Sequence, residues 1–525
     1  MLRPSRLLPI LLAFTSALAA DAAPRWRTLR APHCTVLSQL SEEETRKWAS
    51  SFEQFIAAAK GFLVVDETAL PPLTVMLFAE GCFDRYKPLD SEKEVRTNVA
   101  GVFGGGSSDG VIALAETQDY YKTRHILFHE STHWLLTGSR TQVPLWLNEG
   151  LAEAFATFEP GAEFGTLGLS IGAHVDLLKT TGWIPWAEIV RTTHHSPLYQ
   201  NNDHVRHFYA QSWLFAHRLL FLDTETGAAA LDRHTRARLH GANPTRAFAI
   251  AIEKNFELVE AQMLEYVHTT RFTPRRLPCP PQAAVTTPYE RASPLVVETA
   301  LAEIATGSRR FETALIHIGR VRSLAPTSPA APELVADYER AHGNTAAAAN
   351  AARQALDLGS RNTTMLTLVA DRELDLQLAP SAGNDEALRH LAAPYLRAAA
   401  MDPRSDSAYC GFARVATRLS APTAADIQFL TTGREFFPDS AWPFVGLAAI
   451  CAKQGNVAET QRLLALALTR PDIVDRIQSQ VAKGGKTAVS AAAATARIEA
   501  LTKSARFDEA IAEFASMLAT PIAGN

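Results

Sequence analysis

Two histidines with helical spacing form the strongest chemical pattern in this sequence. The segment 129–133, HESTH, lies within an apolar helical pattern that ends at Gly138. On a helix, His129 and His133 project from one face about one turn apart, so both imidazoles can bind one metal ion. Glu130 lies to the side, where its carboxylate can take a proton from metal-bound water. The spacing predicts a zinc site with two histidine ligands and Glu130 as the general base.

Zinc in such a site needs a third protein ligand and an open fourth position. The next predicted helix presents Glu149 and Glu153, four residues apart on one face. Glu149 is the better candidate ligand, and Glu153 is the better candidate for holding a ligand imidazole in its proper tautomer. The reverse assignment stays open at this point.

The alternative reading of HESTH is an ordinary solvated helix face. In a chain of this length, a chance HExxH has a probability of order a few per cent. Here the motif comes with a flanking apolar helix, a helix stop and a carboxylate-bearing helix 15 residues later. This combination favours zinc binding.

These residues resemble a known group of enzymes. The segments HESTH and VPLWLNEGLAEAF are similar to a gluzincin metallopeptidase, and more closely to the peptidase-MA-like family of bacterial proteins. The resemblance covers about residues 26–270 and implies an α+β zincin-like domain with zinc bound by the two histidines and Glu149. The gap from His133 to Glu149 is shorter than in thermolysin, whereas the gap to Glu153 is thermolysin-like, which keeps the ligand assignment open.

The resemblance also implies where a substrate would lie. A predicted hairpin, 98–103 and 110–115, occupies the place of the gluzincin edge strand. Gly101, Val102 and Phe103 on that strand would pair with an extended peptide. A flexible turn is the alternative explanation for the glycines that join the two strands.

A later segment, FYAQSW, resembles the Tyr-Ala-Gln-Ser helix of the same family. The resemblance implies that Tyr209 donates to the oxyanion of the tetrahedral intermediate, with His204 and His207 as alternative donors. Packing or surface roles are the competing explanation for each of these residues. The remaining histidines near the motif have no expected role; they are His125, His194 and His195.

The rest of the chain differs in pattern. Residues 26–275 mix strand and helix patterns, 276–289 are rich in proline and are predicted as a linker, and 290–525 are almost wholly helical. Within this helical region a loose motif recurs with a period near 34, which is typical of a tetratricopeptide (TPR) array. The alternative is a helical bundle without repeats. The recurring segments are 310–314, 344–348, 455–459 and 505–510.

The N-terminus predicts export. Residues 1–20 combine early arginines, an apolar stretch and the small-x-small site Ala17–Ala19, as in a secretory signal peptide. A short buried helix is the alternative. No later apolar run reaches the roughly 18 residues that span a bilayer, so no transmembrane segment is expected. Export would also permit a Cys34–Cys82 disulfide.

Composition removes one class of function. The chain of 525 residues has 51 Lys and Arg against 55 Asp and Glu, a formal net charge of -4. Such a balance lacks the basic footprint of a general nucleic-acid binder.

The sequence therefore predicts an exported, periplasmic or secreted zinc metallopeptidase that hydrolyses peptide bonds through a zinc-bound water activated by Glu130. Its helical repeats would bind a peptide or protein substrate or a protein partner. Two alternatives remain: a catalytically silent scaffold whose repeats bind protein, and a zinc hydrolase acting on cell-wall peptides. The intact Glu130 argues against the silent scaffold.

Overall fold

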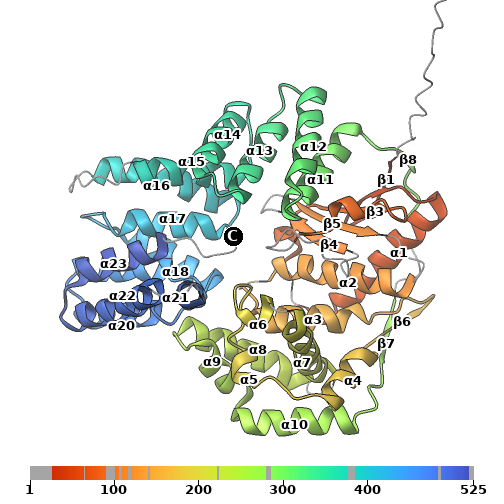
Figure 1. The fold of residues 1–525 in the computed structure, drawn as a ribbon, viewed down its shortest axis with the longest axis horizontal. Helices are drawn as coiled ribbons and strands as arrows, with labels where there is room; N and C mark the ends of the chain where they lie inside the picture. Colours follow the sequence, from red (N-terminus) through yellow and green to blue (C-terminus); the bar gives the residue numbers. More distant parts are fainter. Residues whose placement is uncertain are drawn as a thin grey trace, which may run out of the picture.

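A computed structural model describes most of the chain. The described residues are 26–63, 65–89, 101–105, 109–115, 120–139, 142–200, 202–221, 224–279, 285–376, 385–482 and 486–519. The predicted signal peptide, residues 1–20, lies outside them. A mixed α/β part is followed by a long series of helices (Figure 1). Among the described residues, no helix is both long and apolar enough to cross a bilayer.

The mixed part is built on a six-stranded sheet with the order β4-β5-β3-β2-β1-β8. The pairs β2–β3 and β3–β5 are parallel, and the other pairs are antiparallel. The predicted hairpin corresponds to β4 and β5, with β4 at the edge of the sheet; residues 98–100 of its predicted first strand lie outside the described residues. The strands are β1 (Arg27–Arg30), β2 (Thr35–Ser38), β3 (Leu73–Phe78), β4 (Gly101–Gly105), β5 (Gly110–Ala115) and β8 (Glu290–Arg291).

Helices cover both faces of the sheet. Successive side chains of a strand point to opposite faces, so neighbouring residues of β3 enter different cores. Val75 packs into the core beneath α1 (Glu42–Ala59) and α2 (Tyr120–Thr137), where Phe55 and Phe128 stack at 4.5 Å. Its neighbour Met76 packs into a second core with α11 (Pro294–Gly307). The first long helix of the C-terminal region is thus part of the sheet's own core.

A group of helices follows α2 and completes the mixed part. Helix α3 packs against α7, and β6 and β7, which are distant in the sequence, form a separate two-stranded antiparallel sheet. These elements are α3 (Leu145–Ala156), β6 (Phe164–Leu167), α4 (Gly172–Thr180), α5 (Trp186–Ile189), α6 (Pro197–Gln200), α7 (Asn202–Phe221), α8 (Thr224–Leu239), α9 (Pro244–Ile252), α10 (Phe256–Thr269) and β7 (Arg275–Pro278).

The segment 276–289, predicted as a linker, is described only at its two ends, because residues 280–284 lie outside the described part of the chain. It begins within β7, which pairs with β6, and it ends next to β8, which pairs with β1. Strand pairing therefore holds both ends of the segment against the mixed part. The helical region begins directly after β8, which belongs to the six-stranded sheet. Its prolines suggest a linker because proline is common between domains, but proline is also tolerated in edge strands.

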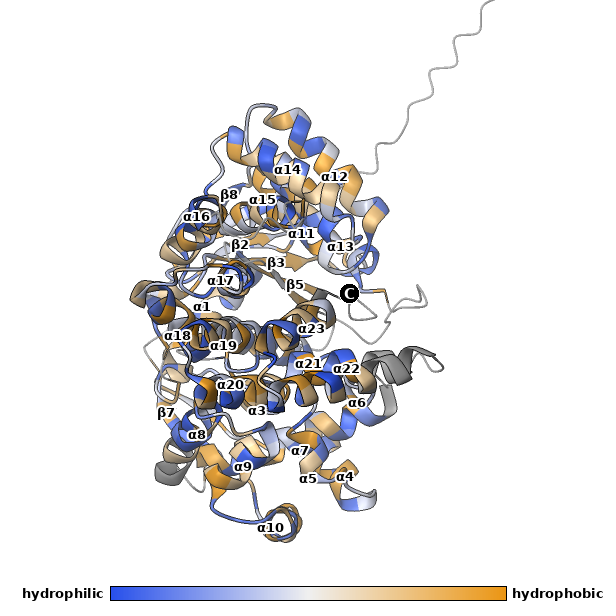
Figure 2. Ribbon diagram, turned by 90° about the vertical axis from the view of Figure 1, so that its left-hand side faces the viewer, coloured by the Kyte–Doolittle hydropathy of each residue, from blue (hydrophilic) through white to orange (hydrophobic). Residues whose placement is uncertain are grey.

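The helical region, here called the array, runs from α11 to α23. Its helices alternate hydrophilic and hydrophobic sides (Figure 2), as amphipathic helices stacked on neighbours do. They are α12 (Phe311–Leu324), α13 (Ala330–Ala341), α14 (Thr345–Asp357), α15 (Thr363–Leu376), α16 (Asp385–Met401), α17 (Asp406–Ala416), α18 (Ala424–Phe436), α19 (Trp442–Lys453), α20 (Val457–Ala467), α21 (Pro471–Ala482), α22 (Lys486–Lys503) and α23 (Phe507–Ala519).

One turn recurs along the array. A residue with left-handed φ follows a helix at Arg309 (59°), Gly343 (78°), Gly455 (73°) and Ala505 (55°). In each case the next N–H donates to the carbonyl five residues back at 2.8–2.9 Å, and the second helix then begins. The recurring turn lies at each of the four segments in which the sequence suggested a repeat.

The five cysteines are all free thiols in the structure, Cys34 and Cys82 included. The disulfide that export would permit between these two is therefore not formed. Burial raises the pKa of the Cys34 thiol well above its usual value.

Candidate metal centre

Two neighbouring helices bring the predicted ligands together. His129 and His133 lie one turn apart on α2, and Glu149 is buried on the adjacent α3. The residue after Glu149 is glycine, and the close passage of α7 requires it. A Cβ at position 150 would lie 2.3 Å from the carbonyl oxygen of Ser212. The glycine of the Asn-Glu-Gly motif thus permits the approach of α7, which carries Tyr209.

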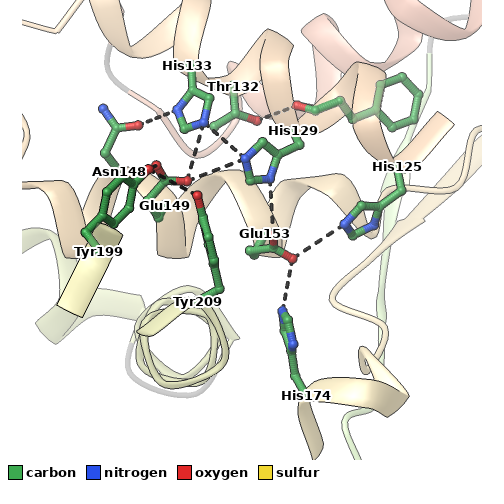
Figure 3. Close-up of polar contacts among 11 residues, drawn as sticks. His125, His129, Thr132, His133, Asn148, Glu149, Glu153, His174, Tyr199 and Tyr209 are labelled. Atoms are coloured by element: carbon green, nitrogen blue, oxygen red, sulfur yellow. Dashed lines mark hydrogen bonds and ion pairs between the residues drawn. The ribbon is translucent and has the colours of Figure 1, made fainter. Parts of the chain in front are cut away.

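The three ligand atoms form a nearly regular triangle (Figure 3). Glu149 Oε2 lies 3.5 Å from Nε2 of His129 and 3.5 Å from Nε2 of His133, and the two nitrogens are 3.1 Å apart. Tetrahedral zinc with bonds of about 2.0–2.1 Å requires ligand atoms about 3.4 Å apart. Glu149 Oε2 is also buried without a hydrogen-bond partner. The residues fit a metal ion coordinated from one side.

The outer nitrogens of the two imidazoles are held by other side chains. Nδ1 of His133 donates to Oδ1 of Asn148 at 2.5 Å, and Nδ1 of His129 lies 3.4 Å from Oε1 of Glu153. With the Nδ1 proton fixed in this way, each Nε2 has its lone pair available for a metal. Glu149 therefore sits at the ligand position, and Glu153 contacts the opposite side of His129.

Glu153 has two further histidine partners. Its Oε2 lies 3.1 Å from Nε2 of His174 and 3.5 Å from Nε2 of His125. Burial raises the pKa of Glu153, but hydrogen bonds from the three histidines outweigh burial and hold the pKa well below its usual range. Glu153 is thus an anion that can polarise His129. His125 was expected to have no role, and no local pattern pointed to His174, which lies on another helix, α4.

Two tyrosines lie against the third ligand. The hydroxyl of Tyr199 donates to Oε1 of Glu149 at 2.9 Å, and the hydroxyl of Tyr209 lies 3.1 Å from that of Tyr199. Because the proton of Tyr199 is used on Glu149, Tyr209 donates to Tyr199. Burial, followed by the charge of Glu149, raises the pKa of both phenols, so both remain protonated. The FYAQSW segment pointed to Tyr209, whereas nothing pointed to Tyr199, because it lies on the short helix α6.

The other candidates are placed as follows. Glu130 is half-buried on α2, and its charge contributes to the raised pKa of Tyr199. His207 contacts Thr181 Oγ1 at 2.8 Å, and His204 is exposed on α7. On the edge strand β4, Gly101 packs so tightly that a Cβ would lie 2.4 Å from the side chain of Ile126 on α2.

The opposite side of β4 has no strand partner among the described residues. Gly101, Val102 and Phe103 pair with β5 on one side only. An edge strand of this kind can accept another extended chain.

In comparisons with known proteins, no family model matches the chain, and no curated protein matches it.

Proposed function

We propose that this chain is a zinc-dependent peptidase. The observation that carries the proposal is the triangle of His129, His133 and Glu149, with a glutamate, Glu130, next to the first ligand on the same helix. Zinc is favoured because two imidazoles and one carboxylate are the ligands of catalytic zinc sites that keep one position open. The zincin-like resemblance of residues 26–270 and the TPR-like resemblance of the array agree with this proposal.

Each side chain has a role in amide hydrolysis. Zinc, when bound, would supply a Lewis acid that polarises the scissile carbonyl and acidifies water. Glu130 would accept the proton of the attacking water and return it to the leaving amine. Tyr209 would donate to the developing oxyanion by turning its hydroxyl away from Tyr199. The free edge of β4 would hold the substrate as an added strand.

Metal content and hydrolysis test the proposal together. We expect about one zinc per chain in the wild type and in Glu130→Gln, and loss of zinc in His133→Ala. Glu130→Gln should abolish the hydrolysis of a fluorogenic peptide library while the metal stays bound. Absence of zinc after reconstitution would contradict the proposal.

The same experiment separates the alternatives. Full zinc occupancy with no cleavage of any peptide would favour the silent scaffold. Cleavage of peptidoglycan fragments in place of ordinary peptides would favour a hydrolase of cell-wall peptides. We also propose that the chain is exported, which N-terminal sequencing of the protein secreted by its host would test.

A further inference from the structure

A large cavity joins the metal centre to the array. Its volume is about 590 Å³, and it is lined on one side by His133 and Asn148. The opposite wall belongs to the array and includes Asp406, Asp472 and Asp475. Cavities of this size hold small ligands or short stretches of peptide.

The array reaches this position by bending back toward the mixed part (Figure 1). Near its start, Tyr86 contacts Nε2 of His317 at 3.0 Å. Farther along, Arg404 donates to the carbonyl oxygen of Gly138 at the end of α2 at 2.9 Å, and Arg470 donates to that of Gly241 at 2.9 Å. Since contacts lie on both sides of the cavity, the array is a fixed wall.

The wall that faces the metal centre carries an excess of carboxylates with unused acceptor atoms. Asp475 is only 6% exposed; its Oδ1 accepts from Thr193 at 2.6 Å, and its Oδ2 has no hydrogen-bond partner among the described residues. Oδ1 of Asp472 is buried without a partner. Asp406, on the same wall, accepts only a weak bond, from Cys410 Sγ at 3.4 Å.

Nearby cations are engaged elsewhere or compensate only in part. Arg238 forms an ion pair with Asp439, and Arg404 donates to the carbonyl oxygens at the end of α2. Burial raises the pKa of Asp472 to about 7, against the hydrogen bond that its Oδ2 accepts from the Ala441 N–H and the charge of Arg476. Burial also raises the pKa of Asp475, against the Thr193 hydrogen bond and the charges of His195 and Arg476. A positively charged ligand group would relieve the unmet charge.

We propose that the array forms the second wall of the substrate cleft and that Asp472 and Asp475 select a peptide with a positively charged group close to the scissile bond. The inference rests on the proposed peptidase function. The positive group is the side chain of lysine or arginine, or a free amino terminus. In either source the recognised chemistry is an ammonium or guanidinium ion bound by carboxylate oxygens.

The test uses the full chain loaded with zinc and matched pentapeptides in which one position carries lysine, norleucine or glutamate. Acetylated and free amino termini distinguish the two sources of charge. We expect kcat/KM for the best lysine peptide to exceed that of its glutamate counterpart by about tenfold or more. Asp475→Asn and Asp472→Asn should each reduce this preference severalfold. In Asp475→Asn the side-chain amide oxygen can still accept from Thr193, so the wall should remain in place.

Asp357→Asn, at an exposed position on α14, is the matched control and should leave the preference unchanged. Binding of the same peptides to zinc-loaded Glu130→Gln, measured by fluorescence anisotropy, provides a second readout. Cleavage without a charge preference, or a preference that survives both wall variants, would overturn this inference and leave the peptidase proposal standing. A charge preference in binding without any cleavage would overturn the peptidase proposal and leave only the recognition of a positive group by Asp472 and Asp475. The absence of both would overturn both.

Discussion

The hydroxyl of Tyr199 donates to Oε1 of Glu149 at 2.9 Å, while the other oxygen of the same carboxylate faces both ligand imidazoles at 3.5 Å. One oxygen of Glu149 is thus held by the protein and the other is left for a metal. Orientation of a ligand by such an outer hydrogen bond tunes metal affinity.

Removal of this hydrogen bond should weaken metal binding. We expect Tyr199→Phe to lower zinc affinity by about 10- to 100-fold, because Glu149 loses the bond that orients it. Competition with a chromophoric chelator measures the affinity. Tyr209→Phe is the control: it should slow hydrolysis but leave zinc affinity nearly unchanged, since the hydroxyl of Tyr209 bonds to that of Tyr199 and not to Glu149. Equal affinities for all three proteins would contradict the assignment.

Gly150→Ala should disturb both stability and the metal centre. The added methyl would lie 2.3 Å from the Ser212 carbonyl oxygen, so α3 and α7 must move apart. Overpacking of this kind costs about 1–3 kcal/mol of unfolding free energy, and zinc affinity should fall because Glu149 is the preceding residue. Thermal unfolding and chelator competition measure the two effects. Gly172→Ala, where nothing lies within 4 Å, should change neither.

The stability of the mixed part should fall in mild acid. Burial lowers the pKa of His217 from 6.5 to about 4, and the neutral ring bridges Tyr266 and the Gly168 carbonyl oxygen at 2.9 Å each. Between these pH values the unfolded chain binds a proton that the folded chain does not, so stability decreases as pH falls. The loss approaches about 3 kcal/mol below pH 4.

Urea unfolding at pH 7 and about pH 4.5, followed by tryptophan fluorescence, measures this dependence, because Trp213 lies 5.6 Å from the His217 ring. His217→Gln should be less stable at pH 7 but should lose less stability between the two pH values. A variant that loses as much stability as the wild type would contradict the prediction.

The recurring turn predicts opposite effects for two exchanges. Ala505 has a φ of 55° and Gly455 a φ of 73°, and the left-handed region favours glycine over alanine by about 1 kcal/mol. Ala505→Gly should therefore stabilise the array. Gly455→Ala should destabilise it, and packing cannot compensate because no atom lies within 4 Å of the new methyl. Urea unfolding followed by circular dichroism tests both. The same sign for the two variants would contradict the shared turn.

Local patterns in the sequence were sufficient for several of the elements. Ser41 and Glu44 form a capping box at the start of α1, with Glu44 N donating to Ser41 Oγ at 3.2 Å. A β-rich run after Pro71 and Pro72 forms β3, and the spacing of His129 and His133 placed both rings on one helical face. These features depend on neighbours within a few residues of one another, which the sequence displays directly.

Tertiary structure decided what depends on contacts between distant segments. The choice of Glu149 over Glu153 as the residue facing both imidazoles followed from the packing of α3 on α2. Tyr199 and His174 entered the site from helices that no spacing rule links to the motif. The strands at the ends of 276–289 pair with β6 and β1, over 100 positions away, and the prolines of this segment give no sign of that pairing. The array became a wall of the cavity only through long-range contacts such as Arg404 with Gly138, which no local pattern encodes.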